Sequence, residues 1–151
     1  MDVRNTPELD TAIRILTLRE HSVYELQNKL IQRNVAPEKI EHILAHLIEL
    51  NYLSDERFAE AYTAERIRKG EGPLKIRANL LQRRIDRSLA ERMIARDELF
   101  WLEKAQGVLK RRLRSIRDDP EIFSSEWSKC LRFLEGRGFP SHIARQAMAD
   151  I

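Results

Sequence analysis

Apolar residues recur three or four positions apart along most of the chain, as in Ile40, Ile43, Leu44 and Leu47. This spacing places them on one face of a helix, and no segment keeps the alternation of a strand for long. Prolines and capping residues indicate where helices begin, as at Thr6-Pro7. We therefore predict an all-α protein with helices over residues 7–20, 22–33, 37–50, 54–69, 73–83, 87–97, 98–117, 120–136 and 141–150.

A short segment recurs three times, at residues 26–35, 76–85 and 130–139. Equivalent positions carry Leu30, Leu80 and Leu134, then Arg33, Arg83 and Arg137, then Val35, Ile85 and Phe139. The segments recur about 50 residues apart. A regular repeat with a period of roughly 20–50 residues is typical of arrays whose units bury a face against the next unit. The pattern predicts a tandem repeat of three three-helix units, 1–51, 52–97 and 98–151, forming an elongated, curved array that binds a large partner.

Each second helix of a unit ends at a residue where a left-handed cap is expected, namely Asn34, Arg84 or Gly138. Glycine and asparagine adopt this geometry readily, whereas an arginine pays roughly 1 kcal/mol. Arg84 therefore has a different cap or another role. A basic side chain held at a corner for a partner and a cation favoured by the helix dipole remain equal alternatives.

The charge is unevenly distributed, although the formal net charge of the 151 residues is only +3. Residues 51–96 carry eleven Lys or Arg against seven Asp or Glu, and residues 97–117 carry six against three. Both ends of the chain are acidic. A basic middle favours a polyanion or an acidic protein as partner, although solvated arginine-rich helix faces are also common.

The sequence contains no motif that indicates catalysis, a nucleotide or a cofactor. His42 and His46 stand one helical turn apart, but HILAH lacks the glutamate of H-E-x-x-H and a third ligand. We predict a protein that is not an enzyme, with no metal and no cofactor. Its single cysteine, Cys130, is expected to be buried, and residues 1–7 lack a secretory pattern, so we expect a cytoplasmic protein.

Basic residues of the middle and third units are the candidate contacts to a partner or to DNA. They are Arg66, Arg68, Lys69, Lys75, Arg77, Arg83, Arg84, Arg87, Lys110, Arg111, Arg114 and Arg117. Such side chains neutralise phosphates without reading bases, which predicts salt-sensitive binding to single-stranded DNA, or else they meet acidic side chains of a protein. The aromatic residues, at helical spacings, are more typical of a core than of base-stacking platforms.

Three ordered segments resemble motifs of the RecX family of bacterial recombination regulators. The first is HSVYELQNKLIQRNV, the second is NYLSDERFAEAYTAERIRKGEGPLKIRANL, and the third is LRFLEGRGFPSHI. They resemble the family's S-x-x-E-L-x-x-K-L, Y-L-D-D-x-R-F-A with K-G-x-G-P-x-x-I, and R-F-L-x-x-R-G-F. The resemblance runs from about Ala12 to Met148. Arg84 stands where the family often has glycine, and Asn79 where it usually has an acidic residue.

The resemblance implies a monomeric helical protein that binds the RecA recombinase and its filament on single-stranded DNA. It further implies modulation, most often inhibition, of the ATPase, coprotease and strand-exchange activities of RecA in recombination and repair. Two alternatives stay open. One is a DNA-binding helical module without sequence specificity, although a helix-turn-helix reader needs base-reading residues on a recognition helix. The other is a helical adaptor of the TPR or armadillo type, although those have other repeat lengths.

Overall fold

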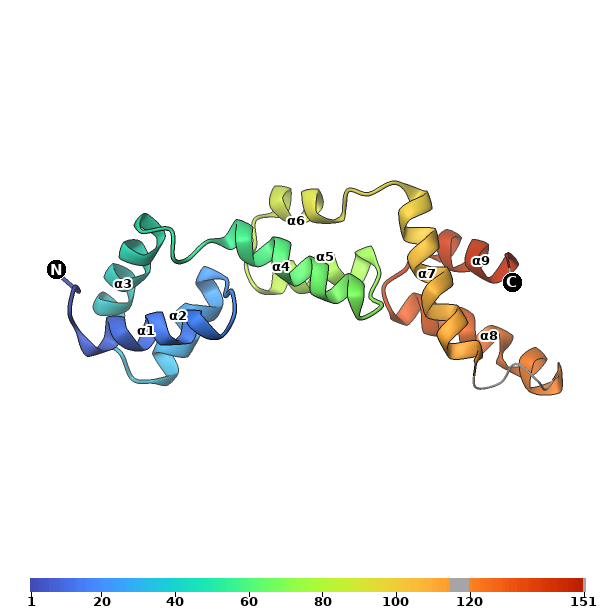
Figure 1. The fold of residues 1–151 in the computed structure, drawn as a ribbon, viewed down its shortest axis with the longest axis horizontal. Helices are drawn as coiled ribbons and strands as arrows, with labels where there is room; N and C mark the ends of the chain where they lie inside the picture. The colour runs from blue at the N-terminus through green and yellow to red at the C-terminus, as the bar shows by residue number, and fades with distance from the viewer. Residues whose placement is uncertain (115–119, 151) are drawn as a thin grey trace. The chain divides into compact units, whose positions relative to one another are not determined.

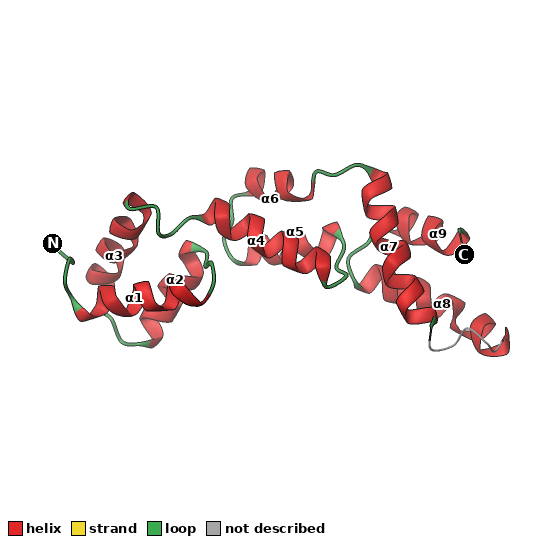
Figure 2. Cartoon of the chain, viewed as in Figure 1, coloured by secondary structure: helices red, strands yellow, loops and turns green. Residues whose placement is uncertain are grey.

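The structure, a computed structural model, describes the backbone of residues 1–114 and 120–150 and the side chains of residues 1–114 and 126–150. Every regular element in these ranges is an α-helix (Figure 2), which confirms the predicted all-α class. The helices are α1 (Pro7–Leu18), α2 (Val23–Gln32), α3 (Pro37–Glu49), α4 (Asp55–Arg68), α5 (Pro73–Gln82), α6 (Arg87–Ile94), α7 (Glu98–Leu113), α8 (Pro120–Gly136) and α9 (Ser141–Ala149).

Side chains cap the starts of α1, as predicted at Thr6-Pro7, and of α2. Thr6 Oγ1 accepts a hydrogen bond from the backbone N–H of Leu9, and Pro7 occupies the first turn. Ser22 and Glu25 form a reciprocal capping box, in which each side chain accepts from the backbone N–H of the other residue. These bonds satisfy amide groups that the first turn of a helix leaves without partners.

The left-handed caps are present in all three repeats. The φ angles are 62° at Asn34, 57° at Arg84 and 102° at Gly138. The next residue, Val35, Ile85 or Phe139, donates its N–H to the carbonyl of Leu30, Leu80 or Leu134, as a Schellman cap requires. Those three leucines are fully buried. The repeat in the sequence is thus a repeated helix end.

Helix α6 ends at Ile94, three residues before the predicted end at residue 97. The reason lies in Asp97, whose carboxylate accepts the N–H of Phe100 at 2.8 Å and caps α7. Trp101 Nε1 also donates to the Ile94 carbonyl at 3.2 Å, and the same carbonyl accepts the backbone N–H of Arg96 at 2.8 Å. An N-cap residue has extended rather than helical backbone angles, so Asp97 cannot extend α6.

Internal contacts divide the chain into two compact units, one of residues 1–62 with 80–89 and one of residues 63–79 with 90–151. In the first unit α1, α2 and α3 pack together (Figure 1). Their core contains Val3, Leu9, Ala12, Ile15, Leu26, Leu30, Ile40, Ile43, Leu44, Leu47 and Leu53. The predicted unit boundaries at residues 51 and 97 stay a prediction, because compactness groups residues by contact rather than by repeat.

In the second unit α7, α8 and α9 pack against one another (Figure 1). The buried side chains at this packing include Trp101, Ala105, Val108, Leu109, Cys130, Leu134, Ile143, Ala144, Ala147 and Met148. Cys130 is 1% exposed, as predicted from its position in the repeat. Not every aromatic residue belongs to a core, because Tyr52 and Trp127 are 53% and 45% exposed.

Candidate partner-binding surface

The loop between α4 and α5 is joined to the turn between α8 and α9 by backbone hydrogen bonds within the second unit. The N–H of Gly72 donates to the Arg137 carbonyl at 2.8 Å, and the N–H of Leu74 donates to the Gly138 carbonyl at 3.0 Å. A Cβ on Gly72 would stand 2.6 Å from the carbonyl carbon of Gly138, which no side chain tolerates. Residues 70–73 (Gly-Glu-Gly-Pro) and residues 137–139 (Arg-Gly-Phe) therefore form one structural element.

Glu71 is the central residue of this loop and is fully buried. Its carboxylate forms an ion pair with Arg66 Nε, and Lys75 Nζ lies 4.0 Å from its other oxygen. A buried carboxylate is tolerated only when cations or donors compensate for its lost hydration. Two of the predicted contact residues, Arg66 and Lys75, therefore carry a structural interaction inside the protein.

A basic pocket of about 450 Å³ lies beside this loop in the second unit. Its lining residues are Arg68, Lys69, Val108, Arg111, Arg112, Phe133 and Arg137. We call it the arginine pocket. The structure thus brings together three residues predicted from sequence, Arg68, Lys69 and Arg111, although they lie about 40 positions apart in the chain.

Arg68, the last residue of α4, and Lys69, which follows it, share one carboxylate. Glu65 Oε1 lies 3.4 Å from Arg68 Nη2 and 3.2 Å from Lys69 Nζ. The hydrogen bond from Lys69 is the main reason why the pKa of Glu65 lies below its ordinary value. Because all three side chains are largely exposed, this pairing is weak and water screens it.

Arg112, Phe133 and Arg137 complete the pocket and were not among the residues predicted to bind a partner. The guanidinium groups of Arg112 and Arg137 lie 4.5 and 5.5 Å from the centre of the Phe133 ring. Arg112 Nη2 also lies 3.3 Å from Glu126 Oε2. Arg137 occupies the arginine position of the repeat, which was a usable signal, whereas nothing in the sequence distinguished Arg112 from its neighbours.

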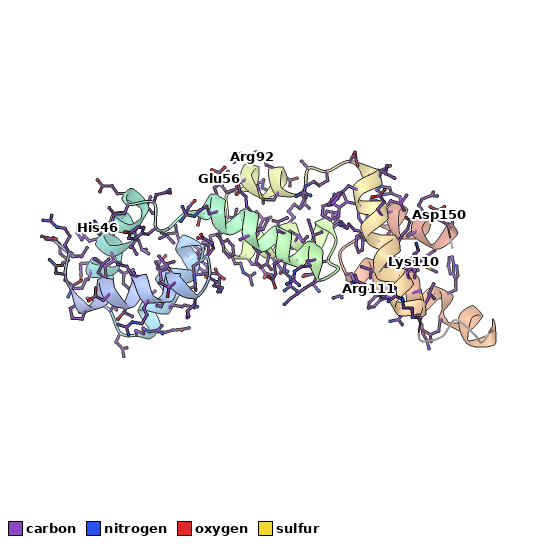
Figure 3. All side chains as sticks on the ribbon, in the orientation of Figure 1. His46, Glu56, Arg92, Lys110, Arg111 and Asp150 are labelled. Carbon is purple, nitrogen blue, oxygen red and sulfur yellow. The ribbon has the colours of Figure 1, made fainter. Side chains whose placement is uncertain are left out.

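Lys110 and Arg111 follow one another on α7 but line different pockets. Arg111 belongs to the arginine pocket, whereas Lys110 lines a pocket of about 310 Å³ together with residues of α7, Ala147 of α9 and Asp150 just after α9. Figure 3 labels Lys110, Arg111 and Asp150. The structure therefore places Lys110 and Arg111, two of the predicted contact residues, at different sites. Arg114 is exposed beyond the end of α7, and Arg117 lies outside the described residues.

In the first unit Arg83 and Arg84 lie against aromatic rings. Arg83 lies 4.8 Å from the centre of the Tyr62 ring, and its Nε is 3.3 Å from Glu25 Oε2. Arg84 lies 4.7 Å from the centre of the Tyr24 ring. A guanidinium over an aromatic face contributes roughly 0.5–1 kcal/mol at exposed sites. Arg84 therefore has a packing role within the first unit that the two sequence-based alternatives did not include.

The two remaining residues that were predicted to contact a partner are Arg77 and Arg87. In the second unit Arg77 Nη1 lies 3.0 Å from Glu91 Oε1, an exposed ion pair. Arg87, at the start of α6, is exposed. Neither residue lines the arginine pocket.

The first unit also contains a buried histidine. His21 is fully buried, with Nδ1 3.0 Å from the Arg19 carbonyl and Nε2 2.7 Å from Lys29 Nζ. Burial is the main reason why the pKa of His21 lies below its ordinary value. The neutral ring then donates from Nδ1 to the carbonyl and accepts from the ammonium group at Nε2.

Asp55, in the first turn of α4, forms a hydrogen bond with the start of α2. Its Oδ1 accepts the backbone N–H of Val23 at 2.8 Å, so it satisfies an amide at the start of α2. Ser54 Oγ meanwhile accepts the N–H of Arg57 and caps α4. Burial raises the pKa of Asp55 despite the hydrogen bond from Val23.

Within the described ranges, no three His, Cys, Asp or Glu residues lie close enough to hold a metal ion. The same ranges contain no helix with the length and apolar character needed to span a membrane.

Comparison with protein families gives two matches. The model of the RecX first three-helix domain matches residues 9–47, and that of the RecX second three-helix domain matches residues 54–94. A crystal structure of RecX from Lactobacillus salivarius has a similar fold. It superposes on this chain with a TM-score of 0.78, and the match covers 95% of this chain and 93% of that one at 22% sequence identity.

Relatives of similar length are each named regulatory protein RecX. The Vibrio vulnificus protein (strain CMCP6) is 32% identical over 154 residues, which cover 99% of this chain and 99% of that protein. The Cronobacter sakazakii protein (strain ATCC BAA-894) is 39% identical over 141 residues, covering 87% and 84%. The Legionella pneumophila protein (strain Corby) is 35% identical over 146 residues, covering 97% and 95%. With both domain models matched and the whole chain aligned to such relatives, this protein belongs to the RecX family of regulatory proteins.

Proposed function

We propose that the protein binds the RecA recombinase and its filament on single-stranded DNA, and that it inhibits the ATPase, coprotease and strand-exchange activities of RecA. The observation that carries the proposal is the joined element formed by the Gly-Glu-Gly-Pro loop and the Arg-Gly-Phe turn. Both segments belong to stretches that resemble motifs of the family, and they meet beside the arginine pocket.

A regulator without chemistry of its own acts through differential binding. If the protein bound free RecA and the filament equally well, it would shift no equilibrium. Its surface must therefore recognise something that only the assembled filament presents, such as the junction of adjacent RecA subunits or the DNA strand. Exposed cations of the second unit, including Arg68 and Arg111, suit a surface that carries negative charge.

The test is a titration of this protein into RecA that hydrolyses ATP on single-stranded DNA. We expect hydrolysis to fall as the protein is added, and the protein to sediment with filaments more than with RecA alone. A rate of hydrolysis that stays unchanged at saturating protein, together with equal co-sedimentation, would contradict the proposal.

A further inference from the structure

We propose that the arginine pocket binds a phosphodiester group of a single-stranded nucleic acid. The proposal rests on the proposed function, because the filament is where this protein would meet a DNA strand. It adds the site and the chemical group that the site takes.

Two guanidinium groups converge on one point beside Gly70. A Cβ built on Gly70 would lie 3.5 Å from Arg111 Nη2 and 3.5 Å from Arg137 Nη2. The two Nη2 atoms are therefore at most about 7 Å apart. Like charges at such a separation repel each other, and an anion near both offsets the repulsion. Glycine keeps a side chain out of this position, where a Cβ would also stand 3.0 Å from Val108 Cγ2, and its φ of 90° is one that other residues rarely adopt.

Among the described side chains, the carboxylates that pair with the cations of the pocket are fewer than those cations. Glu65 is shared by Arg68 and Lys69, and Glu126 is shared by Arg112 and Lys129. Within the part of the chain whose side chains are described, Arg111 and Arg137 form no ion pair with a carboxylate. Five basic side chains therefore surround a space that has room for a further negative group.

Phe133 holds the guanidinium groups in place instead of offering a surface for a base. Arg112 and Arg137 both lie over its ring, and Arg137 Nη2 also donates to the Lys69 carbonyl at 3.1 Å. Fixing a guanidinium before the ligand arrives lowers the entropy cost of binding. Because two guanidinium groups already lie over this ring, we expect the pocket to recognise backbone phosphate and not base identity.

The arrangement of the cations favours a phosphate over a carboxylate. They come from three segments: the end of α4, the last turns of α7, and the turn after α8. A planar carboxylate is satisfied by one guanidinium that binds both oxygens from one side. The two charged oxygens of a phosphodiester are arranged around a tetrahedral phosphorus instead of in the plane of a carboxylate, so donors from three segments can approach them from different directions. We therefore infer a phosphodiester in preference to an acidic peptide.

The experiment measures binding of a fluorescein-labelled thymidine oligonucleotide to the full-length protein, without RecA, over a series of salt concentrations. Arg111→Glu and, separately, Arg68→Glu are compared with the parent protein. The matched control is Arg92→Glu, an exposed arginine on α6 outside the pocket whose reversal changes the net charge equally (Figure 3). Circular dichroism verifies the helical content of each variant.

We expect each pocket variant to weaken binding about tenfold at low salt, and the slope of log affinity against log salt to fall by about 0.7 for each lost phosphate contact. Arg92→Glu should change the affinity less than about twofold. Equal losses in Arg111→Glu and Arg92→Glu would overturn the proposal, since only net charge would then matter. If Arg111→Glu unfolds, Arg68→Glu decides, because that side chain is 71% exposed.

A second arm replaces the oligonucleotide with a polyglutamate peptide. If the peptide binds in an Arg111-dependent manner and the oligonucleotide does not bind, the pocket takes carboxylates and the phosphodiester assignment is wrong. Because RecA is absent, this outcome is independent of the ATPase titration. If the protein binds the oligonucleotide through Arg111 but does not affect RecA, the proposed function is wrong and the assignment of the pocket to a phosphodiester stands.

Discussion

Gly138 and Lys75 approach each other so closely that a Cβ on Gly138 would stand 2.5 Å from the Cβ of Lys75. Gly138 also has a φ of 102°, where side chains are strained. The turn after α8 can thus pack on the start of α5 only if glycine occupies this position. The arginine pocket depends on this contact, because Arg137 immediately precedes Gly138.

Substitution of this glycine should destabilise the second unit. We expect Gly138→Ala to lower the free energy of unfolding by more than about 1 kcal/mol, because it adds a steric clash to an unfavourable φ angle. Gly136→Ala is the matched control, since nothing lies within 4 Å of its Cβ position and the residue is helical. That variant should be neutral or stabilised by up to about 1 kcal/mol. Urea unfolding measures both, and equal stabilities would refute the close-packing argument.

The buried carboxylate should matter more than an exposed one. We expect Glu71→Gln to cost about 1–3 kcal/mol, because it removes the charge that Arg66 and Lys75 face inside the loop. The corresponding change Glu65→Gln, at an exposed pair, should cost about 0.5 kcal/mol or less. Thermal unfolding of the two variants distinguishes these outcomes, and a Glu71→Gln variant as stable as the parent would show that the ion pairs contribute nothing.

The stability of the first unit should depend on pH through His21. Its pKa is lower in the folded protein than the ordinary value of 6.5. The folded state therefore favours the neutral ring, and this contribution is complete above pH 6.5 and is lost as the pH falls below it. Protonation would also place a second positive charge against Lys29 and near Arg19, with Glu25 as the compensating acid.

Unfolding in urea at about pH 7.5 and about pH 5.5 tests this expectation. The parent protein should be less stable at the lower pH, and His21→Gln should reduce the difference. His42→Gln, at an exposed position on α3, should leave it unchanged. The expectation is wrong if His21→Gln and the parent lose the same free energy between the two pH values.

Arg84 combines an unfavourable backbone angle with a favourable side-chain contact, and two substitutions separate them. Arg84→Ala removes the contact with Tyr24 and keeps the left-handed strain, so we expect a loss of about 0.5–1 kcal/mol. Arg84→Gly removes both and should be about 1 kcal/mol more stable than Arg84→Ala. Chemical denaturation gives the two values. Equal stabilities would mean that the φ of 57° carries no strain here.

If the proposed function is correct, Lys110 and Arg111 should differ in their effect on RecA. We expect Arg111→Ala to raise the protein concentration needed to suppress ATP hydrolysis several-fold. Lys110→Ala should have little effect, because Lys110 lines a different pocket. Both changes are at exposed positions and should alter stability by about 0.5 kcal/mol or less. Equal effects of the two variants would indicate a contact that covers both sides of α7.

Much of the fold could be predicted from the sequence, because the signals are local. The capping box at Ser22 lies within a single turn, and the buried position of Leu30 follows from helical spacing. The left-handed residues at the ends of α2 and α8, Asn34 and Gly138, were predicted from their position after each repeated helix, whereas the cap at Arg84 was left open and is left-handed as well. A helix end depends on bonds among neighbouring residues, so a short segment contains the information.

Only the tertiary structure assembled the arginine pocket. Successive residues of a helix point about 100° apart, so Lys110 and Arg111 face different neighbours once α8 and α9 are packed against α7. Arg112 gained its role from Phe133, and Arg111 from the glycine loop near residue 70. The sequence determined which helices form and where they end. The packing of segments far apart in the chain decided which cations share one space, because that depends on contacts that no local pattern specifies.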